Sequence, residues 1–565
     1  MMKKAKTVNP SRTKGFRSLV YFPILSLLFL VSACSEEETF VEEPQAVAAA
    51  TEYNLLLSSA TSSTPTVIVD ADRSYNTSGK NDMDVVRKYF YSGSINNDNL
   101  SCNSTKSLFS EEAEYGQAIK LRGARAINAE RGCYLDANGN IVASMALKSA
   151  LDNIHNHDWQ LHLVVGQEKP KHLSGYAWQW NAAQWNAYEN YVYKILLHSM
   201  NNYRGGFQTG MVEVSNEVDI AGPFGYWCVE GKWSHGDLQA FYGIMKCYAE
   251  WSDAVKRFNR DYPTKRVKLI GPAMTVYTMW WSRETNNWAL KFLEECKAKN
   301  YLMDGVSFHQ YGAEMLNRQP DYSGGRNPSF KSTIKKIQDK MTSLGYSNGE
   351  IWITEWGVSN WINTARVKNN YRPVGGAFAA AFMVDALDSG VDGIVPLRFR
   401  DPNGSDTWTE IGSLATNNYK IYPKPTYNVF RMFNMLPGFR RKLAWQNQGT
   451  QLGAIAASSS SQIGVIVYNY DWDDIHILDN SIPHDVQIKI AKQGVNGDVR
   501  VKRYLIDKDH SNLGKYLDAG QAPVPEDVDL EKVEEIKVQA SNGIITLPSR
   551  NLGQSAVSMW VIDLN

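Results

Sequence analysis

Two glutamates stand at the ends of apolar, strand-like segments, where an acid is unexpected. Glu217 closes the segment "MVEVSNE", and Glu355 lies near the end of "IWITEWG". An ionised carboxylate at the end of a buried strand is costly unless it is paired or has a function. Two carboxyl groups about 5 to 5.5 Å apart are what cleavage of a glycosidic bond with retention requires, because one protonates the leaving oxygen while the other attacks the anomeric carbon. The pair is therefore a candidate catalytic set for glycoside hydrolysis.

Short apolar segments alternate with amphipathic helices between about residues 85 and 435. The segments read as strands are "KYFYSGS", "AIKLRGA", "QLHLVVG", "MVEVSNE", "VKLIGPA", "GVSFHQY", "IWITEWG" and "GIVPLRF". Strand–helix alternation implies parallel strands with right-handed crossovers, and eight units predict a (β/α)8 TIM barrel, an α/β fold. A doubly wound sheet is the alternative, but no GxGxxG or P-loop motif follows any of these strands.

The predicted barrel brings the two glutamates together. Active sites of such barrels lie at the carboxyl ends of the strands. Glu217 ends the fourth strand and Glu355 the seventh, and these strands face each other across the mouth of an eight-stranded ring. The barrel thus explains why a buried strand finishes in an acid.

The C-terminal part of the chain has a different pattern. From "GAIAASSSSQIGVIVYNYD" onward, short alternating strands such as "VQIKIAK", "VRVKRYLID", "GIITLP" and "AVSMWVID" predict a β-sandwich. The segment "PTVIVDAD" precedes the barrel and is expected to add a strand to that sandwich. The predicted divisions are a leader at 1–33, a tether at 34–64, the N-terminal strand at 65–80, the barrel at 81–438 and the sandwich at 439–565.

The N-terminus reads as a lipoprotein leader. A basic start is followed by the apolar run "LVYFPILSLLFLVSA", which is short for a membrane-spanning helix and suits a signal-peptide core. Small residues then precede Cys34 in "VSAC", which resembles the lipobox of bacterial lipoproteins, where this cysteine is acylated. The acidic "SEEE" behind it resembles the export tags of surface lipoproteins. We expect a protein of the bacterial cell envelope, lipid-anchored in the outer membrane; a soluble secreted protein is the alternative.

Composition excludes some partners. Lys plus Arg equals Asp plus Glu at 59 each, which argues against a surface that binds nucleic acid. The cysteines form neither a CxxC motif nor a Cys/His metal spacing, so we expect no metal site and no cofactor. The chain contains 17 Trp, 29 Tyr and 19 Phe, which indicates a large core, a cleft that stacks on flat ligands, or both.

The motifs "SNE", "HQY" and "TEW" resemble those of the clan A retaining glycoside hydrolases, which are (β/α)8 enzymes. The resemblance implies that Glu217 is the acid/base and Glu355 the nucleophile. It further implies that Asn216 binds the sugar 2-hydroxyl, and that Tyr311 orients Glu355 by a hydrogen bond. His309 of "HQY" is assigned to substrate binding.

Two families of this clan resemble different parts of the chain. The segment "VDADRSY...MDVVRKYFYSGS" is similar to the start of family 86, the β-agarases and β-porphyranases. The segment "VRVKRYLIDKDHSNLGKYLDAG" resembles the sandwich of family 39, the β-xylosidase and iduronidase family. The chain departs from family 39 at Val218, where that family has proline after Asn-Glu.

The substrate is predicted from side chains near the strand ends. Sugar rings stack on indoles, and the tryptophans at or after strand ends are Trp178, Trp180, Trp227, Trp233, Trp280, Trp281, Trp356, Trp361 and Trp408. About half of these are expected to be core, and Trp281 and Trp356 are selected as substrate-binding. Arg398 and Arg400, two residues apart on the last strand, share a face and suit a sulfate or carboxylate on the sugar. An ordinary ion pair with Asp401 or another neighbouring residue is the alternative.

The predicted function is that of an endo-acting agarase or porphyranase on red-algal galactan. A β-xylosidase-like exo-glycosidase is the alternative, and a non-catalytic glycan-binding lipoprotein is the second alternative. A binding protein has no need of both Glu217 and Glu355, so the enzyme hypothesis is preferred. The sequence leaves the oligomeric state open.

Overall fold

The computed structural model of the chain describes residues in several ranges. These are 53–54, 56–57, 63–75, 91–92, 114–127, 130–156, 158–202, 210–217, 219, 238–275, 287–312, 328–358, 369–401, 413–417, 420–471 and 481–564. The predicted leader and most of the predicted tether, with Cys34, lie outside them, as does Trp281. Among the helices in these ranges, none is both long enough and apolar enough to cross a membrane.

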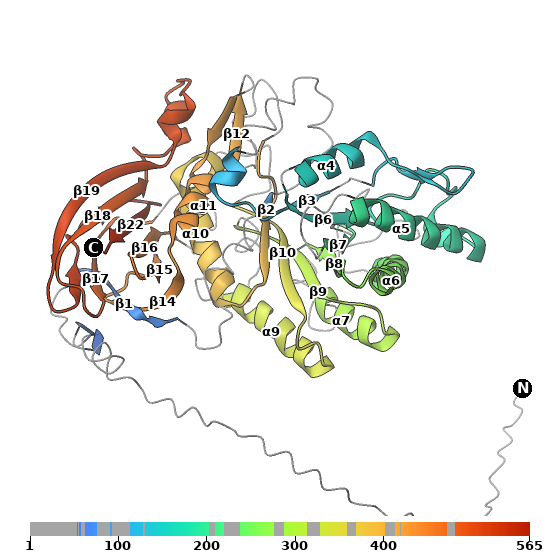
Figure 1. Cartoon of the computed structure of the whole chain (residues 1–565), viewed down its shortest axis with the longest axis horizontal. Helices are drawn as coiled ribbons and strands as arrows, with labels where there is room; N and C mark the ends of the chain where they lie inside the picture. Colours follow the sequence, from blue (N-terminus) through green and yellow to red (C-terminus); the bar gives the residue numbers. More distant parts are fainter. Residues whose placement is uncertain are drawn as a thin grey trace, which may run out of the picture. The chain divides into compact units, whose positions relative to one another are not determined.

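One sheet consists of eight parallel strands surrounded by helices (Figure 1). In ladder order the strands are β2 (Tyr91–Ser92), β3 (Gly123–Ala126), β6 (Gln160–Val165), β7 (Gly210–Val214), β8 (Val267–Met274), β9 (Gly305–Tyr311), β10 (Glu350–Gly357) and β11 (Gly393–Pro396). The two end strands of this ladder, β2 and β11, also contact each other, which brings the sheet close to a closed ring. The predicted (β/α)8 barrel is confirmed.

Helices follow the strands and cover the outside of the barrel. They are α4 (Met145–Asn156), α5 (Ala182–Asn202), α6 (Leu238–Asp261), α7 (Trp288–Lys299), α9 (Pro328–Leu344), α10 (Pro373–Asp388) and α11 (Pro425–Met435). Most surface helices bury one face, but α10 is buried along nearly its whole length. It contacts strands of the second sheet as well as barrel elements, so it needs apolar residues on both sides.

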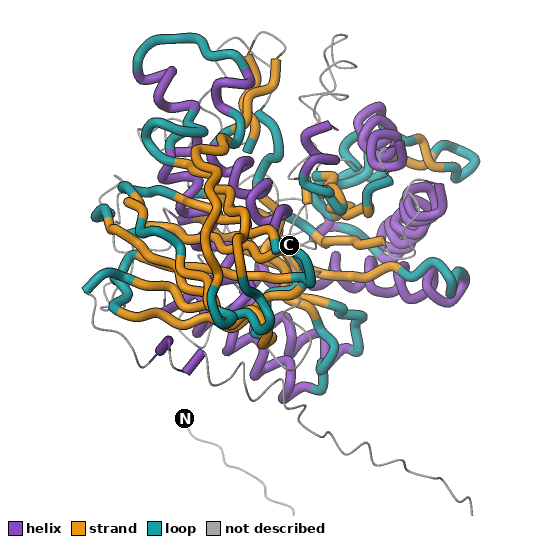
Figure 2. The backbone as a smooth tube through the Cα atoms, turned by 60° about the vertical axis from the view of Figure 1, so that its left-hand side comes forward, coloured by secondary structure: helices purple, strands orange, loops and turns teal. Residues whose placement is uncertain are grey.

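The second sheet has ten strands and contains the C-terminal part of the chain (Figure 2). Its strands, in ladder order, are β19 (Glu531–Ala540), β18 (Gly497–Ile506), β22 (Val557–Asp563), β16 (Gln462–Asn469), β15 (Leu452–Ser458), β14 (Phe439–Gln446), β1 (Thr66–Ser74), β17 (His484–Ala491) and β20 (Ile544–Thr546), with β21 (Arg550–Leu552) beside β17.

This second sheet curls at β14. The first residues of β14 pair with β15, whereas most of its length pairs with β1. The inner faces of the two halves enclose their own apolar core, which includes Val67, Val465, Ile488 and Trp560. The predicted C-terminal β-sandwich is thus present as a curled sheet. β1 contributes to it, antiparallel to β14 and parallel to β17.

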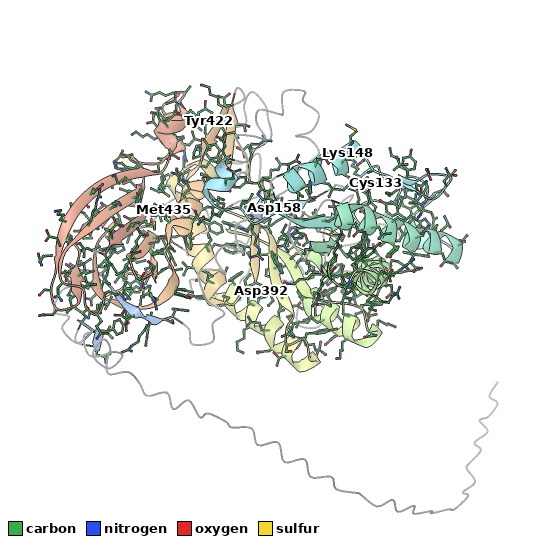
Figure 3. The ribbon with its side chains drawn as sticks, viewed as in Figure 1. Cys133, Lys148, Asp158, Asp392, Tyr422 and Met435 are labelled. Carbon is green, nitrogen blue, oxygen red and sulfur yellow. The ribbon has the colours of Figure 1, made fainter. Side chains whose placement is uncertain are left out.

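Two barrel strands differ from their predicted positions. The second predicted segment, "AIKLRGA", was expected at 118–124, but residues 114–118 are helical and β3 begins only at Gly123. The apolar Ile119 and Leu121 are buried in the connection before β3. Because they are two residues apart, they show the alternation that is typical of a strand. The last strand ends at Pro396, three residues before the end of the predicted segment "GIVPLRF". At its start, Asp392 (labelled in Figure 3) accepts a hydrogen bond from the Ile351 N–H at 2.9 Å and fixes the register with β10.

Candidate active site

The backbone after β7 is held in an unusual conformation. Ser215 and Glu217 have φ angles of 74° and 51°, in the left-handed region that side chains rarely adopt. The Glu217 N–H donates to the Ala273 carbonyl at 2.9 Å, and the Asp219 carboxylate accepts from the Thr275 N–H and hydroxyl. These bonds fasten the end of β7 to the end of β8. Strained backbone of this kind clusters at active sites.

A β-bulge in β10 sets the direction of the Glu355 side chain. The β9–β10 ladder pairs Ile353 with Phe308 and Glu355 with His309, so an extra residue, Thr354, lies between the two pairs. Bulges re-aim side chains next to active sites. Here the Thr354 hydroxyl donates to Glu213 inside the barrel at 2.6 Å, and Glu355 also points inward.

His309 connects the two candidate catalytic acids. Its Nδ1 lies 3.0 Å from Glu217 Oε1 and 3.4 Å from Glu355 Oε2. One carboxylate oxygen of each glutamate and a ring nitrogen of His309 lie within 4.8 Å of one another. This proximity is compatible with the separation of about 5 to 5.5 Å between carboxyl groups in retaining glycosidases, and it is short for an inverting pair.

Glu355 is held by donors on both oxygens. Arg125 Nη1 donates to Oε1 at 2.8 Å, and the Tyr311 hydroxyl donates to Oε2 at 2.9 Å. The hydrogen bond expected from Tyr311 is therefore present. The Glu355 side chain is 6% exposed, whereas that of Glu217 is 22% exposed. The two acids thus occupy different environments: one is enclosed and anchored, and the other is open to solvent.

Arg125 is the centre of a buried polar cluster. Besides Glu355, its guanidinium donates to Glu213 Oε2 at 2.7 Å and to Asn216 Oδ1 at 2.8 Å. His162 Nε2 lies 3.1 Å from the same Glu213 oxygen. A buried charge is tolerated only when it is paired and hydrogen-bonded, and Arg125 pairs with two carboxylates at once. Asn216 is thereby fixed with its carbonyl toward Arg125.

The charged groups in this cluster stabilise one another's ionised forms. Burial acts to lower the pKa of Arg125, but Glu213 and Glu355 raise it above its usual value. Burial acts to raise the pKa of Glu213, but the charge of Arg125 and the bond from His162 hold it well below its usual value. Burial also opposes protonation of His309, yet the negative charge of Glu355 and the bond to Glu217 raise its pKa. Arg125 is a cation and Glu213 an anion at neutral pH.

Sequence reasoning missed Arg125, Glu213 and His162. Glu213 and His162 lie inside segments that were read only as apolar strands, and Arg125 directly follows another such segment. A charged or imidazole side chain in the middle of a buried strand must find a partner, so three such strands side by side were a signal for an internal polar cluster. Arg125 was also hidden by the misplaced boundary of β3, which put it after the strand instead of inside it.

Only some of the predicted substrate-binding residues lie at the candidate site. Asn216, His309 and Tyr311 lie with the two glutamates. Trp356 was wrongly assigned: it is 2% exposed and stacks on Phe382 with ring centroids 5.0 Å apart. The residue after Glu355 on a strand points the opposite way, which here is into the core.

The two arginines lie beyond the last barrel strand, which ends at Pro396, so their spacing does not place them on one strand face. Arg400 is 3% exposed, and its Nη1 donates to the Asp401 carbonyl at 3.0 Å, while Arg398 is half-buried. The Asp401 carboxylate, the partner in the alternative prediction, lies 2.6 Å from Lys424 Nζ. The internal acceptor of Arg400 gives no support to a sulfate-binding role.

Among the described residues, Glu217, His309 and Glu355 also form a group that could hold a metal ion. Carboxylates and imidazole are ordinary ligands of divalent cations. Here, however, the atoms already serve as partners of one another and of Arg125 and Tyr311. A second positive charge would lie beside Arg125, so this donor set fits a hydrogen-bonded acid pair better than a cation site.

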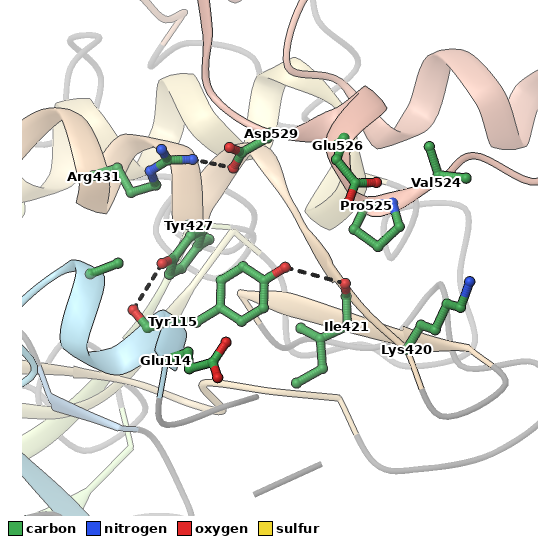
Figure 4. Close-up of a pocket in the computed structure, with 11 residues that line it drawn as sticks. Glu114, Tyr115, Lys420, Ile421, Tyr427, Arg431, Val524, Pro525, Glu526 and Asp529 are labelled. Atoms are coloured by element: carbon green, nitrogen blue, oxygen red, sulfur yellow. Dashed lines mark hydrogen bonds and ion pairs between the residues drawn. The ribbon is translucent and has the colours of Figure 1, made fainter. Parts of the chain in front are cut away.

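A separate cavity of about 610 Å³ lies where the barrel meets the C-terminal part of the chain (Figure 4). Its walls include Tyr115, Tyr427 of α11, and the ion-paired Arg431 and Asp529. The Tyr427 hydroxyl donates to the Tyr115 carbonyl at 2.8 Å. Neither candidate catalytic glutamate lines this cavity, so it is separate from the barrel mouth.

A buried acid beside the mouth predicts a pH-dependent stability. Glu130 follows β3, and its Oε1 accepts from the Gln167 N–H at 2.9 Å. Burial raises its pKa from 4.5 to about 8. Between these values the folded state holds a proton that the unfolded state has lost, so the free energy of unfolding falls as pH rises, by at most about 1.4 kcal/mol per pH unit.

We therefore expect Glu130→Gln to reduce this slope, because glutamine cannot ionise. Urea denaturation at pH 5, 6.5 and 8 measures the free energy of unfolding. Glu168→Gln, at an exposed neighbouring position, is the matched control and should keep the slope of the unsubstituted protein. Parallel pH curves for the Glu130 variant and the unsubstituted protein would contradict the prediction.

Comparisons with known proteins find similarity between this chain and glycoside hydrolases. A family model described as the glycosyl hydrolase catalytic core matches residues 239–388, a range that contains His309, Tyr311 and Glu355. The β-xylosidase of Caldicellulosiruptor saccharolyticus is 20% identical over 321 residues, which cover 54% of this chain and 59% of that protein. The alignment thus spans less than two thirds of the relative.

Solved structures share the fold at low identity. The GH39 enzyme from Xanthomonas axonopodis pv. citri has a TM-score of 0.64 and 13% identity, covering 88% of this chain and 97% of its own. A monomeric β-xylosidase from Caulobacter crescentus CB15 has a TM-score of 0.62 and 13% identity, covering 88% and 99%. The predicted likeness to family 39 is therefore present, and the family 86 resemblance has no counterpart among these relatives. Together the findings support a clan A glycosidase.

Proposed function

We propose that the chain is a retaining glycoside hydrolase that acts on β-xylosides. The observation that carries the proposal is the pair Glu217 and Glu355, whose carboxylate oxygens converge on His309 at the carboxyl end of the barrel. A glycan-binding protein without catalysis would gain nothing from strained backbone and a buried guanidinium that hold this pair in place.

The environments of the two acids support a different role for each. Glu355 accepts hydrogen bonds on both oxygens and faces the cation Arg125, so it is held as an oriented anion, as a nucleophile requires. Glu217 keeps access to solvent, as a group that gives a proton to the leaving oxygen and later takes one from water requires. This assignment agrees with the one implied by the "SNE" and "TEW" motifs.

The reaction then follows two displacements. Glu217 donates its proton to the glycosidic oxygen while Glu355 bonds to the anomeric carbon, and the aglycone leaves. Water, deprotonated by Glu217, next attacks the same carbon and releases Glu355. His309 positions Glu217 through Nδ1. Arg125 bonds to both Glu355 and Asn216, so one side chain orients the nucleophile and the amide that is expected to bind the sugar 2-hydroxyl.

The choice of β-xylosides rests on the named relatives, two of which are β-xylosidases. The agarase or porphyranase specificity expected from the N-terminal segment lacks such support. The test is release of nitrophenol from 4-nitrophenyl β-D-xylopyranoside and of xylose from xylobiose, beside digests of agarose and porphyran. Hydrolysis of the xylosides is expected; cleavage of the galactans without the xylosides would refute the substrate assignment.

We also propose that the protein is a lipoprotein of the bacterial envelope, anchored through Cys34. More than one acyl chain is needed for stable membrane binding, and acylation of a lipoprotein cysteine meets this need. Cys34→Ala is expected to move the protein from the membrane fraction to the soluble one, whereas Ser35→Ala should not. Unsubstituted protein that is soluble and carries no lipid at its mature N-terminus would overturn the proposal.

A further inference from the structure

Two exposed aromatic side chains stack on the loop between β6 and α5. Tyr176 and Trp178 are 51% and 40% exposed, and their ring centroids lie 6.3 Å apart with planes only 10° from parallel. Large aromatic side chains are normally mostly buried, so an exposed pair with nearly parallel rings requires an explanation. Apolar surface of this kind on a protein marks a place where something binds.

The loop that carries the pair starts beside the catalytic centre. In a (β/α)8 barrel, each loop from a strand to the next helix lies on the catalytic face. This loop leaves β6, the neighbour of β7, and the carbonyl of Val165 at its start accepts from the Ser215 N–H, two residues before Glu217. The aromatic pair therefore belongs to the rim of the same mouth, on the acid/base side.

The pair is also held in place before any ligand arrives. The Tyr176 N–H donates to Gln179 Oε1 at 3.4 Å, and the Trp180 indole N–H donates to the Ser174 carbonyl at 3.0 Å. Beneath the loop, Trp180 packs on Trp185 with centroids 5.1 Å apart. Because these side chains are already ordered, a ligand that binds them causes a smaller loss of conformational entropy.

One more contact completes the platform. Lys169 lies with its ammonium 5.4 Å from the centre of the Tyr176 ring and donates to the Gly175 carbonyl at 2.6 Å. Gly175 has a φ of 71°, which allows the turn that presents Tyr176 and Trp178 side by side. The result is a pair of exposed, nearly parallel aromatic rings beside a polar group, which suits the apolar C–H face and the hydroxyl groups of a pyranose ring.

We propose that Tyr176 and Trp178 form a binding platform for a chain of β-linked pyranose sugars that extends away from the catalytic centre. The proposal rests on the proposed function in one respect: it takes the occupant to be a longer form of the same substrate. The platform would make oligosaccharides and polysaccharides better substrates than a single xyloside with a small aglycone.

The experiment separates binding from hydrolysis. Protein with Glu355→Gln, alone and combined with Trp178→Ala or with Tyr176→Ala, is run on native gels containing soluble arabinoxylan, mixed-linkage β-glucan or agarose. Phe439→Ala, an equally exposed aromatic on β14, is the matched control. We expect retardation by at least one polysaccharide, weakened about tenfold in apparent affinity by either platform substitution and unchanged by Phe439→Ala.

Hydrolysis is measured in parallel with Glu355 restored. We expect Trp178→Ala to lower kcat/KM for xylohexaose more than kcat/KM for 4-nitrophenyl β-D-xylopyranoside. Retardation that the platform substitutions leave unchanged, or no retardation in any gel, overturns the platform. If retardation is lost on substitution but no xyloside is hydrolysed, the platform stands and the proposed function fails.

Discussion

Glu355→Ala is expected to lower kcat for an aryl β-xyloside by roughly 10⁴-fold, because without this carboxylate no covalent glycosyl-enzyme forms. Azide is a small anion that fits the space left by the carboxylate and attacks the anomeric carbon directly. A single displacement inverts that carbon, so the rescued reaction should yield the α-glycosyl azide. The rate with and without azide, and the anomer of the product, are measured.

Glu217→Ala is the matched comparison. In this variant Glu355 still displaces a good leaving group, and azide then attacks the intermediate without needing a base. Two displacements return the original configuration, so the product should be the β-glycosyl azide. If the two variants gave each other's products, the roles of the acids would be exchanged. If both variants kept normal rates, the pair would not be catalytic.

Arg125→Met is expected to lower the free energy of unfolding by about 3–5 kcal/mol, the scale on which removal of one partner from a buried ion pair destabilises a protein. The reason is that Glu213 and Glu355 are left in the barrel without the cation that bonds to both. Urea denaturation at neutral pH measures the loss. Activity should fall as well, because Arg125 orients Glu355 and Asn216.

Two further variants make this result specific. Arg260→Met removes an exposed arginine paired with Asp261 and should cost less than about 1 kcal/mol. Adding Glu213→Gln to Arg125→Met removes one of the stranded charges and should restore part of the lost stability. An Arg125 variant as stable as the Arg260 variant would contradict the view that the buried cluster depends on this guanidinium.

The candidate catalytic pair could be found from sequence because each glutamate closes a strand-like segment in a regular strand–helix alternation. The segments that became β7, β9 and β10 are largely buried, and each is followed by or ends in polar residues that the barrel gathers at its mouth. Strand order then places Glu217 opposite Glu355 without any knowledge of contacts. The hydrogen bond from Tyr311 to Glu355 follows from the same register.

Other features depend on contacts that no local pattern encodes. β3 has the sequence Gly-Ala-Arg-Ala, which is too small and too polar to be read as a strand, yet it supplies Arg125. The bulge at Thr354 turns two consecutive side chains inward, and only the ladder with β9 reveals it. Trp356 was misjudged because a tryptophan beside a catalytic acid suits a sugar-binding site and a core position equally.

The anomeric form of the first sugar released tests the central claim most directly. Proton NMR of 4-nitrophenyl β-D-xylopyranoside hydrolysis in D₂O, recorded before mutarotation, distinguishes the two outcomes. The close approach of Glu217 and Glu355, within 4.8 Å, predicts β-xylose as the first product, formed by double displacement. Initial release of α-xylose would mean direct attack by water across a wider gap between the carboxyl groups, and would contradict this account of the site.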